Sequence, residues 1–199
     1  MPARFVYWMN ISLDGFIEGR PAPAGDRGAP DWIRIDEQLH RFFNELAKAM
    51  TMGVEGRVIH DMMDPFWPDA RFDESLPDYL REYGEIWTAQ PKILVSRSRT
   101  AADHNTTIYG DDAIPRLAEL RQESEGDIGV GGADLATQLL AAGLLDELML
   151  FTHPALLGVG RPLFDSPADA IARPLLLDLL EQRTFDSGVT FRRYAIARQ

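Results

Sequence analysis

Short apolar runs of the kind that form buried strands alternate along this chain with segments of helical periodicity, and this alternation restricts the fold to the α/β class. The first run, residues 5–9, is continuous rather than alternating, which is typical of a strand covered on both faces. Glycine directly after a helical segment predicts its end, as at Gly143. The predicted strands span residues 5–9, 92–96 and 127–130, and the predicted short helices span residues 114–120 and 134–142.

A longer helix is predicted after the segment rich in proline and glycine at residues 21–30. Apolar side chains recur there at steps of three and four residues, which is the pattern of an amphipathic helix. Asp31 stands at the position expected for the N-cap of this helix. The apolar positions are Trp32, Ile35, Leu39, Phe42, Leu46 and Ala49.

Two strand-like runs, residues 175–185 and 189–197, are joined by Asp186-Ser187-Gly188. A short polar connection that contains glycine is typical of a β-hairpin. No repeat of fixed period and no linker composition marks a domain boundary, so residues 1–199 are expected to form one domain. We therefore expect a mostly parallel sheet flanked by helices, with an antiparallel hairpin at its C-terminal edge.

The charge balance excludes several classes of partner. The chain carries 20 Lys and Arg residues against 31 Asp and Glu residues, a net charge of −11. The resulting field repels nucleic acids and anionic membranes. Residues 1–10 lack the apolar core of a secretory signal, and the chain has no run of the about 18 apolar residues that a membrane-spanning helix needs. We expect a cytoplasmic protein that binds neither nucleic acid nor membrane.

The chain lacks the residues that several common catalytic mechanisms need. The chain contains no cysteine, which excludes disulfides, thiolate zinc sites and a cysteine nucleophile. Its only lysines, Lys48 and Lys92, do not follow glycine, so no P-loop is present, and no G-x-S-x-G motif indicates a hydrolase. The histidines lack the spacing of a zinc site, so we interpret them as surface or core residues and expect no metal. They are His40, His60, His104 and His153.

The pair Gly131-Gly132 is the most informative local pattern. It follows a predicted strand and opens a predicted helix, so backbone N–H groups and the positive helix end can face a phosphate. The pattern departs from a dinucleotide-binding fingerprint, because Asp134 stands where a small residue is expected. On spacing alone, a phosphate-binding turn and a simple tight turn are equally favoured.

Several further segments are informative as a set, because they occur in a particular order and spacing along nearly the whole chain. They are NISLDGFI at 10–17, GR at 56–57, FWP at 66–68, PKILVSRS at 91–98, VGGADLA at 130–136, LDEL at 145–148, PALLGVGRPLF at 154–164 and TFDSGV at 184–189. Together they resemble the C-terminal reductase domain of the bacterial bifunctional riboflavin-biosynthesis deaminase-reductase, which has the dihydrofolate reductase fold. The resemblance is specific as a set, although each segment alone is common.

This resemblance implies that NADPH lies across the carboxyl ends of the sheet strands. Glycine at the turn would let the backbone approach the pyrophosphate, and a guanidinium fork suits the 2′-phosphate. Without the resemblance, Arg97 would be interpreted as a solvated arginine at a strand end. The implied cofactor-binding residues are Asn10, Ile11 and Ile17 at the nicotinamide, Gly56 and Arg57 after the predicted long helix, Ser96 and Arg97 at the 2′-phosphate, and Gly131, Gly132, Ala133 and Asp134 at the pyrophosphate.

The chain departs from the family pattern in two places, and the first bears on the cofactor. The family usually continues Gly-Arg with one residue and then Thr-Tyr-Glu, whereas here Ile59, His60 and Asp61 follow Val58. A hydroxyl for the cofactor phosphate or the helix start is therefore missing, and such a cap is typically worth about 1 kcal/mol. The chain also lacks the zinc signature of the deaminase half, so we expect it to correspond to the reductase half alone.

Reduction of a C=N bond or a masked aldehyde by hydride also needs a proton donor. The resemblance to dihydrofolate reductases points to an acid on the predicted long helix, here Asp36 or Glu37, although acids in a first turn commonly compensate the helix dipole. Asp14 and Trp32 are the expected substrate-binding residues, although Asp-Gly after a strand more often forms a turn.

We therefore expect an NADPH-dependent reductase that transfers a hydride to a small heterocycle. The substrate classes implied are a pyrimidine resembling 5-amino-6-ribosylaminouracil phosphate and a dihydropterin. The alternatives are a noncatalytic nucleotide-binding or sensor domain of the same fold and an oxidoreductase that uses a deazaflavin or flavin. A homodimer is expected, because the resemblance implies one and because the apolar segments 144–145, 148–151 and 156–157 exceed what one face buries.

Overall fold

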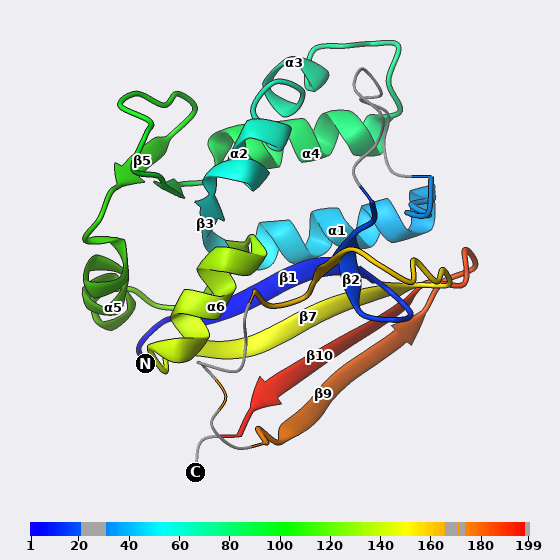
Figure 1. The fold of residues 1–199 in the computed structure, drawn as a ribbon. Coiled ribbons are helices and arrows are strands. Elements are labelled where there is room, and N and C mark those ends of the chain that lie inside the picture. The colour runs from blue at the N-terminus through cyan, green and yellow to red at the C-terminus, as the bar shows by residue number, and fades with distance from the viewer. Residues whose placement is uncertain (21–30, 166–170, 172–173, 198–199) are drawn as a thin grey trace.

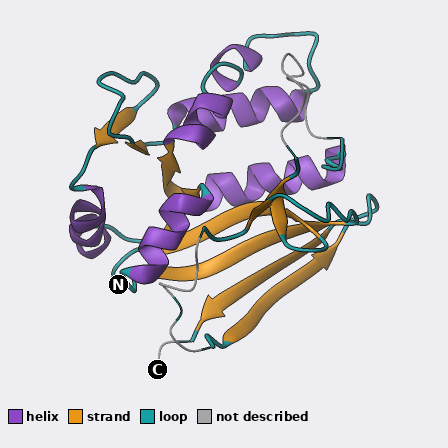
Figure 2. Ribbon diagram, viewed as in Figure 1, coloured by secondary structure: helices purple, strands orange, loops and turns teal. Residues whose placement is uncertain are grey.

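The computed structural model describes residues 1–20, 31–165, 171 and 174–197. A large mixed sheet carries helices on both faces, and a small two-stranded sheet lies beside it (Figure 1, Figure 2). The strands are β1 (Arg4–Ser12), β2 (Phe16–Glu18), β3 (Met50–Gly56), β4 (Lys92–Val95), β5 (Thr106–Tyr109), β6 (Asp127–Gly131), β7 (Leu145–His153), β8 (Arg161–Pro162), β9 (Leu177–Thr184) and β10 (Thr190–Ile196). The helices are α1 (Glu37–Ala49), α2 (Arg57–Met63), α3 (Trp67–Ala70), α4 (Asp78–Ala89), α5 (Ala113–Glu123) and α6 (Ala133–Ala141).

The strands of the large sheet follow the order β5-β4-β3-β6-β1-β7-β10-β9. The first six strands in this order are parallel, whereas β10 runs antiparallel to both β7 and β9. The parallel strands therefore all end at one edge of the sheet, which we call the carboxyl edge, and begin at the opposite amino edge. The structure confirms the expected mostly parallel sheet with an antiparallel C-terminal hairpin.

Helices cover both faces of the parallel strands. On one face, Leu117 of α5 and Leu135 of α6 belong to a mixed aliphatic and aromatic core. On the other face, Phe42 and Phe43 of α1 lie edge-on to the ring of Phe151 in β7. None of the helices within the described ranges is long and apolar enough to cross a bilayer. Burial on both faces explains the continuous apolar sequence at residues 5–9 of β1.

The predicted strands, short helices and hairpin are all confirmed, with ends that differ by a few residues. Gly143 follows α6 with a φ of +67°, as expected of a glycine that ends a helix. The predicted N-cap at Asp31 is wrong. The helix begins at Glu37, and Asp36 is its N-cap, accepting a hydrogen bond from the Leu39 N–H at 2.8 Å.

The apolar surplus predicted on β7 is also wrong. Leu145, Leu148 and Phe151 are 3%, 4% and 0% exposed, because β7 is an interior strand between β1 and β10. Leu156 is exposed, but the larger apolar surface lies on the edge strand β9 and just before it. Its exposed residues are Leu175, Leu176, Leu177, Leu179 and Leu180.

Four charged side chains from four adjacent strands close a network at the amino edge. Arg4 of β1 donates to Asp127 of β6 and to Glu147 of β7, and Arg193 of β10 donates to the same two carboxylates. The side chains of Glu147 and Asp127 are 5% and 13% exposed, so both negative charges are largely removed from water. This amino-edge network ties together the strands at the centre of the sheet.

Candidate active site

The carboxyl edge collects glycines and polar side chains from distant parts of the chain. Asn10 lies near the end of β1, Gly56 ends β3, Gly131 ends β6, and His153 ends β7. Ser96 follows the last residue of β4. In α/β sheets the crevice outside the carboxyl ends of the strands is the usual place for ligands.

His153 is the centre of a hydrogen-bonded group at this edge. It is fully buried, its Nδ1 accepts a hydrogen bond from the Arg34 N–H at 3.0 Å, and its Nε2 lies 3.0 Å from the Asn10 Oδ1. Burial, with a smaller contribution from the Arg34 charge, lowers the pKa of His153 to about 4. The imidazole is therefore neutral near pH 7. The bond from Arg34 also holds residues 32–35 outside the helix, which is why α1 begins later than the apolar pattern predicts.

Trp32, one of the predicted substrate-binding residues, lies beside this group. Its ring meets the His153 ring edge-on, with the ring centroids 5.6 Å apart. Trp32 and Asn10 are both half-buried, so parts of both side chains remain accessible. Sequence reasoning placed His153 among surface or core histidines. It is a core histidine, but only the pairing of β1 with β7 brings it to Asn10.

Asp14, the other predicted substrate-binding residue, joins two loops. Its carboxylate accepts hydrogen bonds from the Ser12 hydroxyl at 2.6 Å and from the backbone N–H groups of Leu157 and Gly158. The Ser12 hydrogen bond and those backbone donors lower the pKa of Asp14 to about 2. As the structure places it, the carboxylate holds the turn after β1 against the loop after β7.

Gly131 and Gly132 form a turn between β6 and α6, as the sequence predicts, and we call it the diglycine turn. Gly132 is the N-cap residue of α6, has a φ of +109° and provides no side-chain cap for the helix. The side chain of Ile59 lies against this turn, since a Cβ added at Gly131 would meet the Ile59 Cγ2 at 3.2 Å. The residue that departs from the family pattern therefore contacts the turn expected to bind the pyrophosphate.

Arginines gather beside the turn at the carboxyl ends of β3 and β4. Arg57 and Arg99 both donate to the carboxylate of Asp61. Burial tends to raise the pKa of Asp61, but the hydrogen bonds from both arginines outweigh it and lower that pKa. Asp61 thus neutralises part of the positive charge at this end of the edge.

The side chain of Arg97 is more exposed and less tightly paired than those of Arg57 and Arg99. Its side chain is 84% exposed, and its nearest acidic partner, Asp111, is 4.0 Å away and equally exposed. The buried Ser96 hydroxyl accepts from the N–H groups of Ser98 and Arg99 and so shapes the loop that carries Arg97. An exposed guanidinium on a loop whose backbone is held by hydrogen bonds is available to an anionic ligand.

A buried polar cluster anchors α2, the helix that carries Arg57 and Ile59. The Glu55 carboxylate pairs with the His60 Nδ1 at 2.9 Å and accepts from the Trp87 indole N–H at 3.1 Å. The Lys92 ammonium donates to the Trp87 carbonyl and lies 4.3 Å from the centroid of its ring. Lys92 is 2% exposed, and burial lowers its pKa to about 8.

The two predicted acids of α1 occupy different environments. Asp36 is half-buried and uses one carboxylate oxygen as the N-cap acceptor. Glu37 is 61% exposed and pairs with Arg41 one turn later. The remaining predicted residues lie where their strands and helix place them. Ile11 is buried in β1, Ile17 is half-buried in β2, Ala133 is buried, and Asp134 is exposed and accepts from Gln138.

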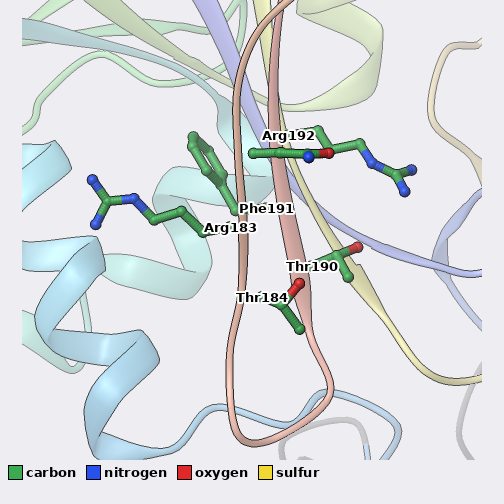
Figure 3. Close-up of a pocket in the computed structure, with 6 residues that line it drawn as sticks. Arg183, Thr184, Thr190, Phe191 and Arg192 are labelled. Atoms are coloured by element: carbon green, nitrogen blue, oxygen red, sulfur yellow. The ribbon is translucent and has the colours of Figure 1, made fainter.

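A separate surface depression lies on the β9–β10 hairpin (Figure 3). Arg183 and Arg192 extend from it to opposite sides in that view, and the Arg183 guanidinium lies 4.4 Å from the centre of the Phe42 ring. None of the predicted site residues lines it. Within the described ranges, no three side chains are grouped in a way that could hold a metal ion. The carboxyl edge is therefore the candidate active site.

Comparison with known proteins gives a consistent result. The family model described as the RibD C-terminal domain matches residues 5–191. Among curated proteins, the chain is 28% identical over 187 residues to the uncharacterized protein YyaP of Bacillus subtilis (strain 168), covering 94% of this chain and 91% of YyaP.

Solved structures show the same fold at low sequence identity. A putative riboflavin biosynthesis protein from Shewanella sp. PV-4 superposes with a TM-score of 0.71 at 20% identity, covering 100% of both chains. A dihydrofolate reductase from Enterococcus faecalis, solved in complex with NADP(H), superposes with a TM-score of 0.60 at 14% identity, covering 98% of this chain and 97% of the other. The dihydrofolate-reductase-like fold expected from the sequence is confirmed.

Proposed function

The chain belongs to the RibD C-terminal domain family, and we propose that it is an NADPH-dependent reductase of a small heterocycle. The observation that carries the proposal is the composition of the carboxyl edge. Along one edge lie a glycine turn at a helix start, an exposed arginine, and a neutral polar group beside a tryptophan. These features suit, in order, a pyrophosphate, an additional phosphate and a planar ring.

The residues at the edge fit a nicotinamide dinucleotide. The first-turn N–H groups of α6 have no side-chain cap, and backbone without Cβ atoms lies at Gly131 and Gly132, a combination that suits an anionic diphosphate. Arg97 would bind the 2′-phosphate from the neighbouring loop. When bound, the reduced cofactor supplies a hydride, and this chain supplies its orientation and a proton.

On the substrate side, we assign Trp32 to contact the heterocycle, and Asn10 borders the nicotinamide beside it. Asp36 is the better candidate for the proton donor, because it lies two residues from Arg34 and is half-buried, whereas Glu37 is exposed and paired with Arg41. Asp14 would act through the loop that it orders rather than by direct contact, since its carboxylate already has three donors.

The packing of Ile59 on the diglycine turn favours a second candidate, a noncatalytic nucleotide-binding domain of the same fold. An apolar side chain at this position offers no hydroxyl to a phosphate. A weakened NADPH site would also be compatible with a deazaflavin or flavin as the donor, which the sequence left as an alternative.

A cofactor screen followed by an assay distinguishes these functions. Incubation of the protein with a cofactor mixture, followed by mass spectrometry of the bound fraction, should recover NADPH rather than a flavin or deazaflavin. NADPH oxidation should then be followed at 340 nm with 5-amino-6-ribosylaminouracil 5′-phosphate and with a dihydropterin. Asp36→Asn should lower kcat about tenfold or more with little change in KM. NADPH binding without turnover of either substrate class would favour the noncatalytic domain.

We also propose a homodimer formed through β9. Among the described residues, no strand pairs with the outer side of this edge strand, which also exposes Leu177, Leu179 and Leu180. Exposed apolar edge strands pair readily with a second copy. Sedimentation should give twice the mass of 22.3 kDa, and Leu179→Lys should give the monomer, while Leu156→Lys should leave the dimer intact. A parent that sediments as a monomer at micromolar concentration contradicts this proposal.

A cytoplasmic location stays a prediction from composition.

A further inference from the structure

The hydrogen bonds of His153 determine which of its nitrogens carries the proton. The Arg34 backbone N–H can only donate, so the Nδ1 that receives it carries no hydrogen. The ring is fully buried, and burial keeps it neutral near pH 7. A neutral imidazole has one N–H, so the proton must be on Nε2.

This tautomer in turn determines the orientation of the Asn10 amide. His153 Nε2–H donates to the Asn10 Oδ1 at 3.0 Å, so the amide nitrogen with its two hydrogens must point away from the imidazole. Among the described residues, the Asn10 Nδ2 makes no hydrogen bond with another side chain or with the backbone. Asn10 is only half-buried, and its Nδ2 is not one of the unpartnered side-chain atoms that are buried, so this nitrogen is accessible. At the carboxyl edge, the hydrogen bond from His153 therefore sets the direction in which the Asn10 Nδ2–H groups point.

We propose that Asn10 donates a hydrogen bond to an amide-type carbonyl oxygen of a bound planar ring, and that His153 is the positioning residue that keeps Asn10 in the donor orientation. The carbonyl belongs either to a lactam of the heterocyclic substrate or to the carboxamide of the nicotinamide. Both present the same acceptor, and the edge-on pair of Trp32 and His153 lies beside the amide in either case. This inference rests on the proposed function, because it takes the carboxyl edge as the place where the two rings meet.

The positioning half is tested on the free protein. The ¹⁵N chemical shifts of His153 should show the Nε2–H tautomer between pH 5.5 and 8, with no titration in that interval. The Nδ1–H tautomer, or an imidazolium at pH 7, overturns the proposal whatever the protein reduces.

The donor half is tested with Asn10→Asp, which keeps an acceptor for the His153 Nε2–H but removes the outward donor. Calorimetric titrations use NADPH, 2′,5′-ADP as the control that lacks the nicotinamide, and two heterocycles, 5-amino-6-ribitylaminouracil and 7,8-dihydropterin. We expect a loss of tenfold or more for one ring-bearing ligand and less than a twofold change for 2′,5′-ADP. A loss for NADPH alone assigns the carbonyl to the carboxamide, and a loss for a heterocycle assigns it to the substrate.

Other results overturn the donor role. Parent-like binding of NADPH and of every heterocycle that the parent binds would do so, as would an equal loss for 2′,5′-ADP, which indicates a general disturbance. If the parent binds no NADPH, the proposed function fails, while the heterocycle titrations still decide the role of Asn10.

A pair of variants at His153 separates positioning from simple packing. His153→Leu fills the space but cannot donate to Asn10, and His153→Gln retains a donor that can reach it. Both variants are compared only if they melt cooperatively. Relative to 2′,5′-ADP, His153→Leu should lose affinity for the ring-bearing ligand that depends on Asn10. His153→Gln should restore at least half of that affinity. Equal ligand binding by both variants overturns the positioning role.

Discussion

The two edges of the sheet hold polar side chains in opposite ways. At the amino edge, Arg4, Asp127, Glu147 and Arg193 are paired with one another across four strands. At the carboxyl edge, the Asn10 amide binds His153 through its oxygen, and its nitrogen has no partner within the described part of the chain. The diglycine turn beside it has no side-chain cap.

The difference indicates a division of labour within one sheet. Charges largely removed from water must be paired, and once paired they have little left to offer a ligand. Neutral groups with one bonded side cost less to keep and remain available for binding. We therefore expect substitutions at the amino edge to change stability and substitutions at the carboxyl edge to change ligand affinity.

The largest effect should follow from opening the amino-edge network with Arg193→Met. Glu147 and Asp127 would each lose a partner while remaining mostly buried, which typically costs about 3–5 kcal/mol. Urea denaturation measures this loss in the free energy of unfolding. Lys48→Met, which removes an exposed ion pair with Glu82, should cost about 1 kcal/mol or less. Similar losses for the two variants would show that the network is not special.

The next effect concerns pH and belongs to the carboxyl edge. His153 has a folded pKa of about 4 against an ordinary value of 6.5, so between these values the unfolded chain binds a proton that the folded chain does not. Its contribution is fully present above pH 6.5 and declines as the pH falls toward 4, by up to about 3 kcal/mol. Urea titrations across this range should show a shallower decline for His153→Gln. Burial also lowers the pKa of His40, which contributes to the decline in both proteins.

Gly132→Val tests whether the diglycine turn binds the cofactor. A side chain at a φ of +109° is strained and would stand where the backbone should meet the pyrophosphate, so NADPH affinity should fall at least about a hundredfold. Gly143→Val is the matched control, because Gly143 also has a positive φ and lies at the opposite end of α6. Both folded variants should melt at lower temperature. NADPH binding like that of the parent by folded Gly132→Val would mean that the turn is purely structural.

Arg97→Ala should weaken NADPH about tenfold, roughly 1.4 kcal/mol, and leave NADH nearly unchanged, because only NADPH carries the 2′-phosphate. Calorimetric titration with both cofactors measures the difference. Arg183→Ala on β9 is a control at a distant exposed arginine. Equal losses for NADPH and NADH would remove Arg97 from the phosphate site.

The smallest effect, and the only expected gain, is at Ile59. Ile59→Thr places a hydroxyl against the diglycine turn, and NADPH affinity should rise about fivefold, near 1 kcal/mol. Ile59→Val keeps the position apolar and should behave like the parent. An unchanged affinity in the threonine variant would show that this position does not contact the cofactor phosphates.

Sequence reasoning succeeded where local pattern and burial agree. The continuous apolar run at residues 5–9 identifies β1, whose side chains belong to the cores on both faces of the sheet. Short apolar segments identify β4 and β6, whose Ile93, Ile128 and Val130 are buried. The glycine after α6 and the short turn of the hairpin are also local signals. The helix start was missed because Asp31 and Asp36 both fit the N-cap pattern, and a distant hydrogen bond between Arg34 and His153 decides between them.

The rest depended on which strands are neighbours. The amino-edge network takes one residue from each of four strands, and no spacing along the chain indicates that order. The leucines before and within β9 have the pattern of a strand, but whether they are exposed depends on β9 being at the edge. The contact of His153 with Asn10 likewise requires β7 beside β1.

The burial of Lys92 has a practical consequence for attaching this protein to a surface. Of its two side-chain amines, only that of Lys48 is accessible, since Lys92 is 2% exposed and hydrogen-bonded inside the fold. Lys48 lies in the last turn of α1, which leads directly into the first residue of β3 at the amino edge. An amine-reactive support would therefore couple through Lys48 or through the exposed amino group of Met1, which precedes β1 at the same amino edge, and would hold every molecule by the same end. The carboxyl edge would face the solution, so an immobilised sample could be screened for ligands without blocking its own candidate site.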